Sequence, residues 1–434
     1  MPPALLDPSA LRTASPRRLA VRVQPAAERA LRSGHPWVFE DSITSVSEAG
    51  GHGDIAVVFD RADRFLAAGL YDPESPIRVR AIVHGEPDEI CRALFRRRIA
   101  DALGRRANVA SAQTTAFRVL NGAGDGMAGL VADLYERTLV LEAFTVAWLP
   151  HLADVVEAFE ELLAPERILL LVADRVAHGD ACPSDLGEGA VLRGAAPPDG
   201  VAFLETGLRF EAHPFRGHKT GFYLDQRANR RRVGAESRDA RVLNVFSYTG
   251  GFSVHAARGG AREVVSVDRA APVLDQAQRH FELNAGDDAV SACRHRTIEG
   301  DAFEVMAGLA DDGQTFDVVV VDPPSFARAA RHRRRALGAY RALTRLAIPL
   351  LRSGGLLVQA SCSSRIGRGE FFRAVEEEVR STGRSGAFRA PARPSGGLPR
   401  GGVPQVRLGA GRESHDSVAV VGLSLPRRPV VHAT

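Results

Sequence analysis

Two short polar segments, each directly after an apolar run, carry the residue types that could do chemistry. Asp322 opens the segment DPPSF after the run Asp317–Val321, and Cys362 lies in SCSS at the end of the run Gly355–Ser361. Two prolines stiffen the first segment and remove backbone donors, so its oxygen atoms can accept bonds from a ligand. A thiol is a strong nucleophile even when little of it is ionised. Taken singly, however, a strand-end Asp often caps a loop, and a strand-end Cys is usually a small buried hydrophobe.

The stretch Arg241–Asp268 reads as a strand, a helix and a second strand that would hold a ligand beside those segments. An apolar run at Val242–Phe246, a helical segment at Phe252–Arg258 and a second apolar run before Asp268 have suitable lengths and patterns. The glycine pair 259–260 suits a left-handed helix cap. In such units small residues let the backbone approach a ligand, and an acidic residue after the second strand accepts bonds from ribose hydroxyls.

The turn after the first strand reads SYTGGFS and lacks the pattern G-x-G-x-x-G that accompanies a dinucleotide pyrophosphate. A nucleoside ligand without phosphates fits better, and S-adenosylmethionine is the commonest of these. The alternative is an ordinary crossover whose glycines serve packing alone.

From residue 207 onward, strand and helix patterns alternate, which predicts an α/β domain with a doubly wound, mostly parallel sheet. Ligands bind such sheets beyond the carboxyl ends of the strands. After the first unit we expect helices at 272–284, 302–310 and 337–351, and strands at 293–298, 317–321 and 355–361. The residues expected at the carboxyl edge are Tyr248, Asp268, Asp301, Asp322 and Cys362.

Composition indicates a globular protein of several domains. The chain has 434 residues, of which 45% are hydrophobic and 25% charged, and a single core seldom exceeds about 300 residues. No apolar run approaches the roughly 20 residues that span a bilayer, and no secretory signal is visible. The four cysteines are far apart, which argues against a structural zinc or disulfide framework and favours a cytoplasmic location. A net charge of +4 is compatible with a nucleic-acid partner without requiring one.

Three folded domains are predicted after a flexible tail at 1–17. Residues 18–85 are rich in short strands and resemble a small β-barrel, which could also be a packing domain. Residues 86–206 form a middle α+β domain, with an amphipathic helix near 87–106 and a β-meander at 117–144. Residues 207–434 form the α/β domain, in which the Gly-, Pro- and Arg-rich stretch 383–411 would precede a last strand.

The chain resembles the bacterial 23S rRNA (cytosine-5)-methyltransferases, which combine a PUA domain, a middle domain and a Rossmann-like class I methyltransferase domain with a seven-stranded sheet. The resemblance rests on HPWVFEDSI, FRVLNGAGDGMAGLVADLYE, GHKTGFYLDQR, VFSYTGGFS, VVSVD, DPPSF and SCS, in the family's order. It covers about residues 18–380. The family tends to close with an Asp-His-Pro stretch and an acidic, tyrosine-containing segment, whereas this chain has ESHDSVAV, and this departure bears on the RNA target more than on the reaction.

The resemblance implies a mechanism. The Cys362 thiolate would attack C6 of cytosine, which activates C5 toward the methyl group of S-adenosylmethionine, while Asp322 would hold or protonate N3. Related enzymes carry a second cysteine in the Pro-rich motif, where this chain has Pro323-Pro324-Ser325, so the base that removes the C5 proton is left unassigned. The target base must leave its stack to reach the site.

The resemblance also implies binding roles. Cofactor contacts are expected around the first turn, at the strand ends and in the hairpin-to-helix segment that opens the α/β domain, where Lys219 is the one lysine of the chain. Substrate contacts are expected from the Pro-rich segment and the basic stretch RAARHRRR after it, near the basic run 230–232, although such stretches are often solvated faces. The cofactor residues are Tyr248, Thr249, Gly250, Phe252, Asp268, Asp301, Asp322, Lys219, Tyr223, Asp225 and Arg227; the substrate residues are Pro323, Pro324, Phe326, Arg328, Arg331 and Arg333.

The partner implied by the resemblance is 23S ribosomal RNA, with no membrane and no metal, and a homodimer is compatible with the sequence. Two other functions stay open. The same fold could methylate guanine at N2 or N7, which needs no covalent thiol, or the chain could be an RNA-binding ribosome assembly factor that has lost catalysis.

Overall fold

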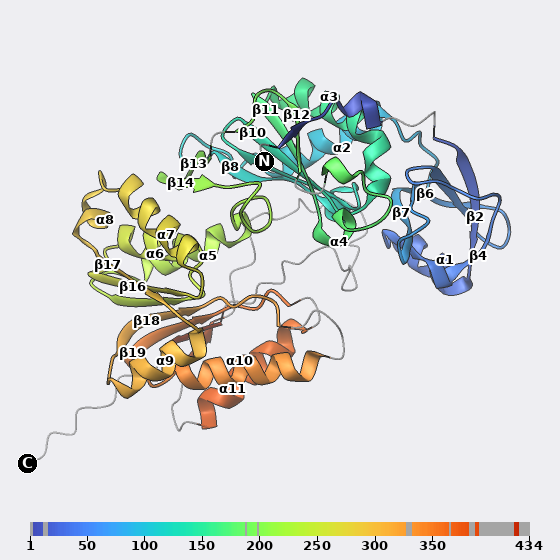
Figure 1. Ribbon diagram of the computed structural model, residues 1–434. Helices are drawn as coiled ribbons and strands as arrows, with labels where there is room; N and C mark the ends of the chain where they lie inside the picture. The colour runs from blue at the N-terminus through green and yellow to red at the C-terminus, as the bar shows by residue number, and fades with distance from the viewer. Residues whose placement is uncertain are drawn as a thin grey trace, which may run out of the picture. The chain divides into compact units, whose positions relative to one another are not determined.

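The computed structural model describes residues 3–11, 16–186, 189–197, 199–326, 332–363, 366–381, 387–389 and 421–424 (Figure 1). The described chain divides into two compact units. One contains the residues up to 207 together with 211–224, and the other contains 208–210 and the described residues from 225 onward. Within the described residues, no helix has the length and apolar character needed to cross a membrane.

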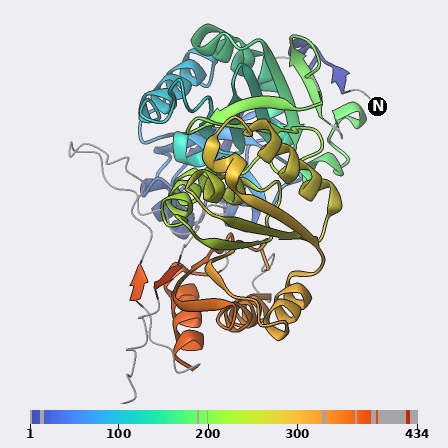
Figure 2. The same ribbon diagram turned by 90° about the vertical axis from the view of Figure 1, so that its left-hand side faces the viewer.

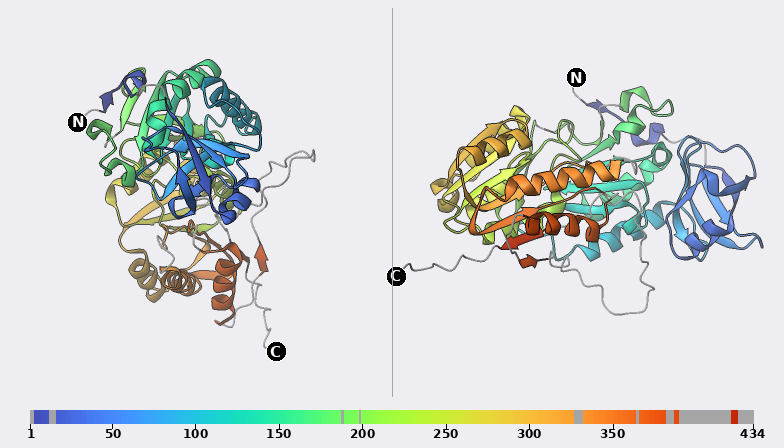
Figure 3. Two further views of the ribbon diagram at one scale, coloured as in Figure 1. Left: turned by 90° about the vertical axis from the view of Figure 1, so that its right-hand side faces the viewer. Right: turned by 90° about the horizontal axis from the view of Figure 1, so that it is seen from below.

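The first unit begins with a six-stranded sheet, drawn in blue in Figure 3, in the order β3-β7-β6-β5-β2-β4. Strands β2 and β5 alternate buried and more exposed residues, because successive side chains of a strand face opposite sides of the sheet, whereas β6 and β7 are buried along most of their length. The short strands expected here are confirmed. The elements are β2 (Arg18–Val23), α1 (Pro25–Arg32), β3 (Trp37–Phe39), β4 (Ile43–Val46), β5 (Ile55–Phe59), β6 (Phe65–Tyr71) and β7 (Ile77–His84).

The rest of the first unit is built on a second six-stranded sheet, in the order β1-β12-β11-β10-β9-β8. The expected meander is present, since β8, β9 and β10 pair antiparallel. The segment 1–17 was expected to be a flexible tail, but its residues 4–5 form strand β1, which pairs with β12 in parallel. Figure 2 shows this short strand beside the green strands. The elements are β1 (Ala4–Leu5), α2 (Arg92–Arg105), β8 (Ala116–Asn121), β9 (Leu130–Tyr135), β10 (Thr138–Ala143), α3 (Leu152–Leu163), β11 (Arg167–Val172), α4 (Asp174–Ala177), β12 (Ala190–Arg193) and β13 (Val201–Glu205).

The second unit contains the expected doubly wound sheet of seven strands, in the order β17-β16-β15-β18-β19-β21-β20. The first five strands run parallel, and β21 and β20 are antiparallel to their neighbours. Its elements are β14 (Leu208–Ala212), which starts in this unit, α5 (Arg227–Ala235), β15 (Arg241–Val245), α6 (Gly251–Arg258), β16 (Glu263–Asp268), α7 (Ala271–Leu283), α8 (Asp288–Ala292), β17 (Arg294–Glu299), α9 (Ala302–Asp311), β18 (Phe316–Val321), α10 (Arg333–Ala347), β19 (Leu351–Gln359), α11 (Arg368–Ser381), β20 (Ala387–Arg389) and β21 (Val421–Ser424).

Helices cover both faces of this sheet, as the apolar strands require. Figure 1 shows α9, α10 and α11 on one face and α5, α6 and α7 on the other. The first face is closed by an apolar cluster in which Val245, Val319 and Leu357 meet Met306 and Tyr340. Because five parallel strands end at the same edge, the loops that follow them are brought side by side.

Candidate active site

The loops after β18 and β19 bring the thiol and the Pro-rich segment together. The strands stay paired to their ends, where Ala360 N donates to Val321 O at 2.9 Å. Directly beyond, Cys362 Sγ lies 3.5 Å from the carbonyl oxygen of Pro323, which follows Asp322. Asp322 and Cys362 are both half-buried, so a ligand can reach them. The expected juxtaposition of a sulfur and a carboxylate-bearing loop at one sheet edge is therefore present.

Tyr340 of α10 contacts both segments that carry these two residues. Its hydroxyl accepts a hydrogen bond from Ser361 Oγ at 2.9 Å, and its ring meets the Phe326 ring edge-on at 5.2 Å. Burial raises the pKa of the Tyr340 phenol, the Ser361 hydrogen bond opposes this, and charge on Cys362 or Asp322 raises it further. Tyr340 therefore stays a neutral phenol and supports the site without acting as a base.

Gln226 is a site residue that sequence reasoning missed, although both its neighbours were selected. It lies at the end of the 3-10 turn Leu224–Gln226, just before α5, and is 4% exposed. Its Nε2 donates to Asp322 Oδ2 at 3.0 Å, and Asn229 Nδ2 donates to its Oε1 at 2.6 Å. The available signal was its place inside the motif GHKTGFYLDQR.

The loop between β15 and α6 has the shape expected of a nucleoside site. Tyr248 and Gly250 adopt left-handed backbone conformations, with φ of 47° and 74°. A Cβ on Gly250 would approach the Cβ of Ala277 to 2.7 Å, so only glycine fits there. Asp268 holds the loop, because its carboxylate accepts from Tyr248 N at 2.9 Å and from Ala270 N at 3.2 Å.

Buried His280 fixes this loop from behind. Its Nδ1 donates to the carbonyl oxygen of Thr249 at 2.7 Å, and its Nε2 accepts from Gln276 Nε2 at 3.1 Å. A carbonyl oxygen can only accept, so Nδ1 carries a proton, and the two contacts set the orientation of the ring. The sequence pattern did not point to His280, because a single His on a helix is uninformative.

Three buried hydroxyls at this edge of the sheet have no hydrogen-bond partner among the described residues: Ser247 Oγ, Thr249 Oγ1 and Ser363 Oγ. Buried polar groups are rarely left unsatisfied in folded proteins. A ligand with ribose hydroxyls and an amino-acid tail offers both donors and acceptors to such groups. The residues present therefore fit S-adenosylmethionine.

Asp301 follows β17 as expected, and it has a structural role. Its Oδ1 accepts from Phe303 N at 2.9 Å, which caps α9. Asp301 is exposed at the same sheet edge as Asp268. Phe252, in contrast, is buried in the first turn of α6, where it helps to hold the loop.

The other expected cofactor residues divide between the two units. Lys219 and Tyr223 belong to the first unit, and Asp225 and Arg227 to the second. The Lys219 ammonium lies 4.7 Å from the centre of the Tyr223 ring, and Lys219 has a left-handed φ of 55°. The next residue, Thr220, donates to buried Asp133 at 2.6 Å, which anchors this loop to β9.

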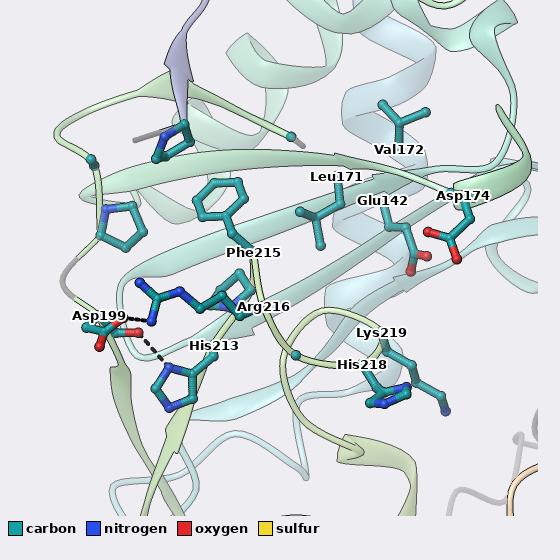
Figure 4. A pocket seen from close by; sticks show the side chains of 17 residues that line it. Glu142, Leu171, Val172, Asp174, Asp199, His213, Phe215, Arg216, His218 and Lys219 are labelled. Carbon is teal, nitrogen blue, oxygen red and sulfur yellow. Dashed lines mark hydrogen bonds and ion pairs between the residues drawn. The ribbon is translucent and has the colours of Figure 1, made fainter. Parts of the chain in front are cut away.

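The first unit has a hollow of about 1140 Å³ beside this loop, which the sequence did not predict (Figure 4). Its wall contains Glu142 of β10, whose carboxyl group faces the hollow near Asp174 and Lys219. Burial raises the pKa of Glu142 to about 7; charge on Asp133 adds to the shift, and Arg118 and Lys219 oppose it. Glu142 is thus a carboxyl group that changes charge near neutral pH.

The expected substrate residues are only partly described. Pro323 is buried and Pro324 exposed, whereas Arg328 and Arg331 lie outside the described residues. Arg333 is exposed and forms an ion pair with Glu370 at 2.8 Å, so it links α10 to α11. Arg230, expected beside the basic stretch, is 2% exposed and therefore belongs to the interior.

Comparisons with known proteins show which families the chain is similar to. A family model described as S-adenosylmethionine-dependent methyltransferase matches residues 187–387, and a PUA-like domain model matches residues 21–83. The chain is 45% identical over 372 residues to a ribosomal RNA large subunit methyltransferase of Deinococcus radiodurans, across 85% of this chain and 90% of that protein. It is 33% identical to ribosomal RNA large subunit methyltransferase I of Alteromonas mediterranea, across 84% and 90%.

Solved structures show the same fold. A methyltransferase crystallised with SAH has a TM-score of 0.76 and 23% identity, across 94% of this chain and all of that one. A SAM-dependent methyltransferase from Streptococcus mutans has a TM-score of 0.75 and 21% identity, across 93% and 99%. The second unit is thus a Rossmann-like methyltransferase domain, and the first begins with a PUA-like domain.

Proposed function

The chain belongs to the family of ribosomal RNA large subunit methyltransferases, and we propose that it methylates C5 of a cytosine in 23S rRNA through a covalent cysteine adduct. The observation that carries this proposal is the Cys362 thiol beside the segment that starts at Asp322, with Sγ 3.5 Å from Pro323 O. The family membership supports ribosomal RNA as the substrate.

The thiol addresses the central difficulty of the reaction, which is that C5 of cytosine is a poor nucleophile. Cys362 reacts as the thiolate, its proton having passed to solvent, and its sulfur forms a bond to C6 that shifts the C5–C6 π electrons and places electron density on C5. Asp322 donates a proton or hydrogen bond to N3 as negative charge develops on the ring. Phe326, whose ring contacts Tyr340, offers a ring face on which the base can stack.

Bound S-adenosylmethionine supplies an electrophilic methyl group to C5. In this proposal Asp268, whose carboxylate also accepts from Tyr248 N, accepts bonds from ribose hydroxyls, and the hydroxyls of Ser247 and Thr249, which have no partner among the described residues, bond polar atoms of the same ligand. Loss of the C5 proton, expulsion of Cys362 as a thiolate and return of the N3 proton to Asp322 then restore the aromatic ring. Pro323 and Pro324 carry no side-chain base, so the proton acceptor in that step stays unassigned.

Methylation of guanine at N2 or N7 is the competing activity for this fold. Those reactions need no covalent attachment, because the target nitrogen is already nucleophilic. The position of Cys362 at the carboxyl edge of β19 favours the cytosine reaction. A non-catalytic assembly role is less consistent with unsatisfied buried hydroxyls around the cofactor loop.

To test the proposal, purified protein is incubated with ribosomal RNA and labelled S-adenosylmethionine, and the modified nucleotide is identified by mass spectrometry. We expect 5-methylcytosine from the wild type and none from Cys362→Ala. The matched control is Cys91→Ala, another half-buried cysteine that lies in the first unit and should leave activity unchanged.

RNA carrying 5-fluorocytosine gives an independent test of the thiol. Fluorine cannot leave C5 as a proton does, so the adduct with Cys362 should survive denaturation. Methylguanine as the product, or an adduct that persists in Cys362→Ala, would disprove the proposal.

A further inference from the structure

We propose that Gln226 is a positioning residue for Asp322, and that its amide hydrogen bond strengthens as Asp322 becomes negatively charged during the reaction. This inference rests on the proposed function, because it presupposes that Asp322 acts on N3 of the target base. Gln226 is 4% exposed, and its Nε2 donates to Asp322 Oδ2 at 3.0 Å.

The orientation of the Gln226 amide is set by its second contact. Asn229 donates to Gln226 Oε1 at 2.6 Å, which turns the Gln226 nitrogen toward the carboxyl group. The opposite orientation would face an amide oxygen toward a carboxylate oxygen, so two acceptors would meet. The two hydrogen bonds therefore run in one direction: Asn229 donates to Gln226, and Gln226 donates to Asp322.

A donor at Oδ2 determines which oxygen of Asp322 can carry a proton. The carbonyl oxygen of a neutral carboxylic acid is the better acceptor, so this contact at Oδ2 favours a proton on Oδ1. The contact with Gln226 limits the orientations that are open to this side chain.

The contact is expected to act on the rate more than on binding. When Asp322 transfers its proton to N3, Oδ2 gains charge, and a hydrogen bond to a charged acceptor is stronger than one to a neutral acceptor. An interaction that is stronger in the transition state raises kcat without lowering KM. Gln226→Met keeps the side-chain length and removes the donor, so kcat should fall about tenfold or more while the KM for RNA stays within about twofold.

Gln226→Glu separates this role from simple packing. A carboxylate at position 226 cannot donate and repels Asp322, whereas its protonated form can donate again. Activity of this variant relative to wild type should therefore recover as the pH falls, and Gln226→Met should show no recovery. Asn229→Ala, which frees the amide to rotate, should give a smaller loss of kcat.

Gln314→Met is the matched control. Gln314 accepts from Arg241 at 3.1 Å near the start of β15, at the opposite end of the strands, and its variant should keep wild-type kcat. Calorimetric affinity for S-adenosylmethionine and melting temperature are measured for each variant.

The possible failures are distinguishable. A wild type that forms neither 5-methylcytosine nor the fluorocytosine adduct would overturn the proposed function. A wild type that forms both, together with unchanged kcat in Gln226→Met, a rise in KM alone, or no recovery of Gln226→Glu at low pH, would overturn the role of Gln226 only.

Discussion

At the scale of single residues, burial makes Glu142 sensitive to pH. Its pKa is raised from 4.5 to about 7, mainly by burial. The folded state therefore binds a proton that the unfolded state has released between these two values. The stability associated with the neutral carboxyl is complete below pH 4.5 and is lost as the pH rises to about 7.

We predict that Glu142→Gln stabilises the protein at pH 8 and has little effect at pH 5. Glutamine removes the cost of burying a charge, which a shift of this size places at about 3 kcal/mol. The measurement is the unfolding free energy of variant and wild type at both pH values. Glu136→Gln, at an exposed turn beside the same strand, is the control. An equal difference at pH 5 and pH 8 would contradict the prediction.

Some residues of the site could be read from the sequence because of the topology. In a parallel sheet every strand end reaches the same edge, so Asp268, Asp322 and Cys362 could be placed together from pattern alone. Gln226 and Glu142 could not, because their surroundings depend on which helix and which strands become neighbours. Asp301 was placed correctly at a strand end, but its capping role emerged only with the start of α9.

At the scale of elements, two adjacent glycines at the end of α6 have different tasks. The expected left-handed cap is Gly260, whose φ is 91°, whereas Gly259 has an ordinary φ of −75°. Gly259 is required for another reason, since a Cβ there would lie 1.8 Å from the carbonyl oxygen of Gly234 in α5. The end of α6 thus contacts the helix that begins directly after Gln226.

Gly259→Ala is therefore predicted to destabilise the second unit more than Gly260→Ala. The first substitution forces α5 and α6 apart, at about 1–3 kcal/mol or more, whereas the second adds only the strain of a positive φ, about 1 kcal/mol. Denaturant unfolding of both variants measures the difference. Because α5 adjoins Gln226, Gly259→Ala should also lower kcat. Equal stability of the two variants would show that the helices can adjust without loss.

Element type was predictable where a single pattern dominated. Apart from α8, the strands and helices from β15 to β18 match the expected spans within a few residues, and for β15, β16 and β18 the reason is that apolar runs buried on both faces are unambiguous. Boundaries were less accurate beyond them: α10 ends at Ala347, before the expected 351, and β19 begins at Leu351. The short helix α8 and strand β1 were missed, since two to five residues give no periodic signal.

At the scale of the whole chain, the PUA-like region shares its core with the segment that follows it. Leu70 and Ile82 belong to the same apolar cluster as Phe95 of α2. Polar contacts also cross the expected boundary at residue 85, because His151 Nε2 bonds Gly53 O at 2.8 Å and Thr145 donates to buried Asp72. A family boundary at residue 83 thus does not mark the end of a folding unit.

We predict that a chain beginning at residue 86 loses stability as well as affinity for RNA. The truncation removes Leu70 and Ile82 and so exposes the apolar surface around Phe95. It also removes Asp72 and Gly53, to which Thr145 and His151 are hydrogen-bonded. The shortened protein should therefore melt at a lower temperature or aggregate, as measured by calorimetry and light scattering. If residues 18–85 were an independent RNA-binding attachment, the shortened chain would keep its melting temperature and its affinity for S-adenosylmethionine, and only the KM for RNA would rise. The shared core argues for the first outcome, since each large apolar side chain taken from it costs about 2–5 kcal/mol.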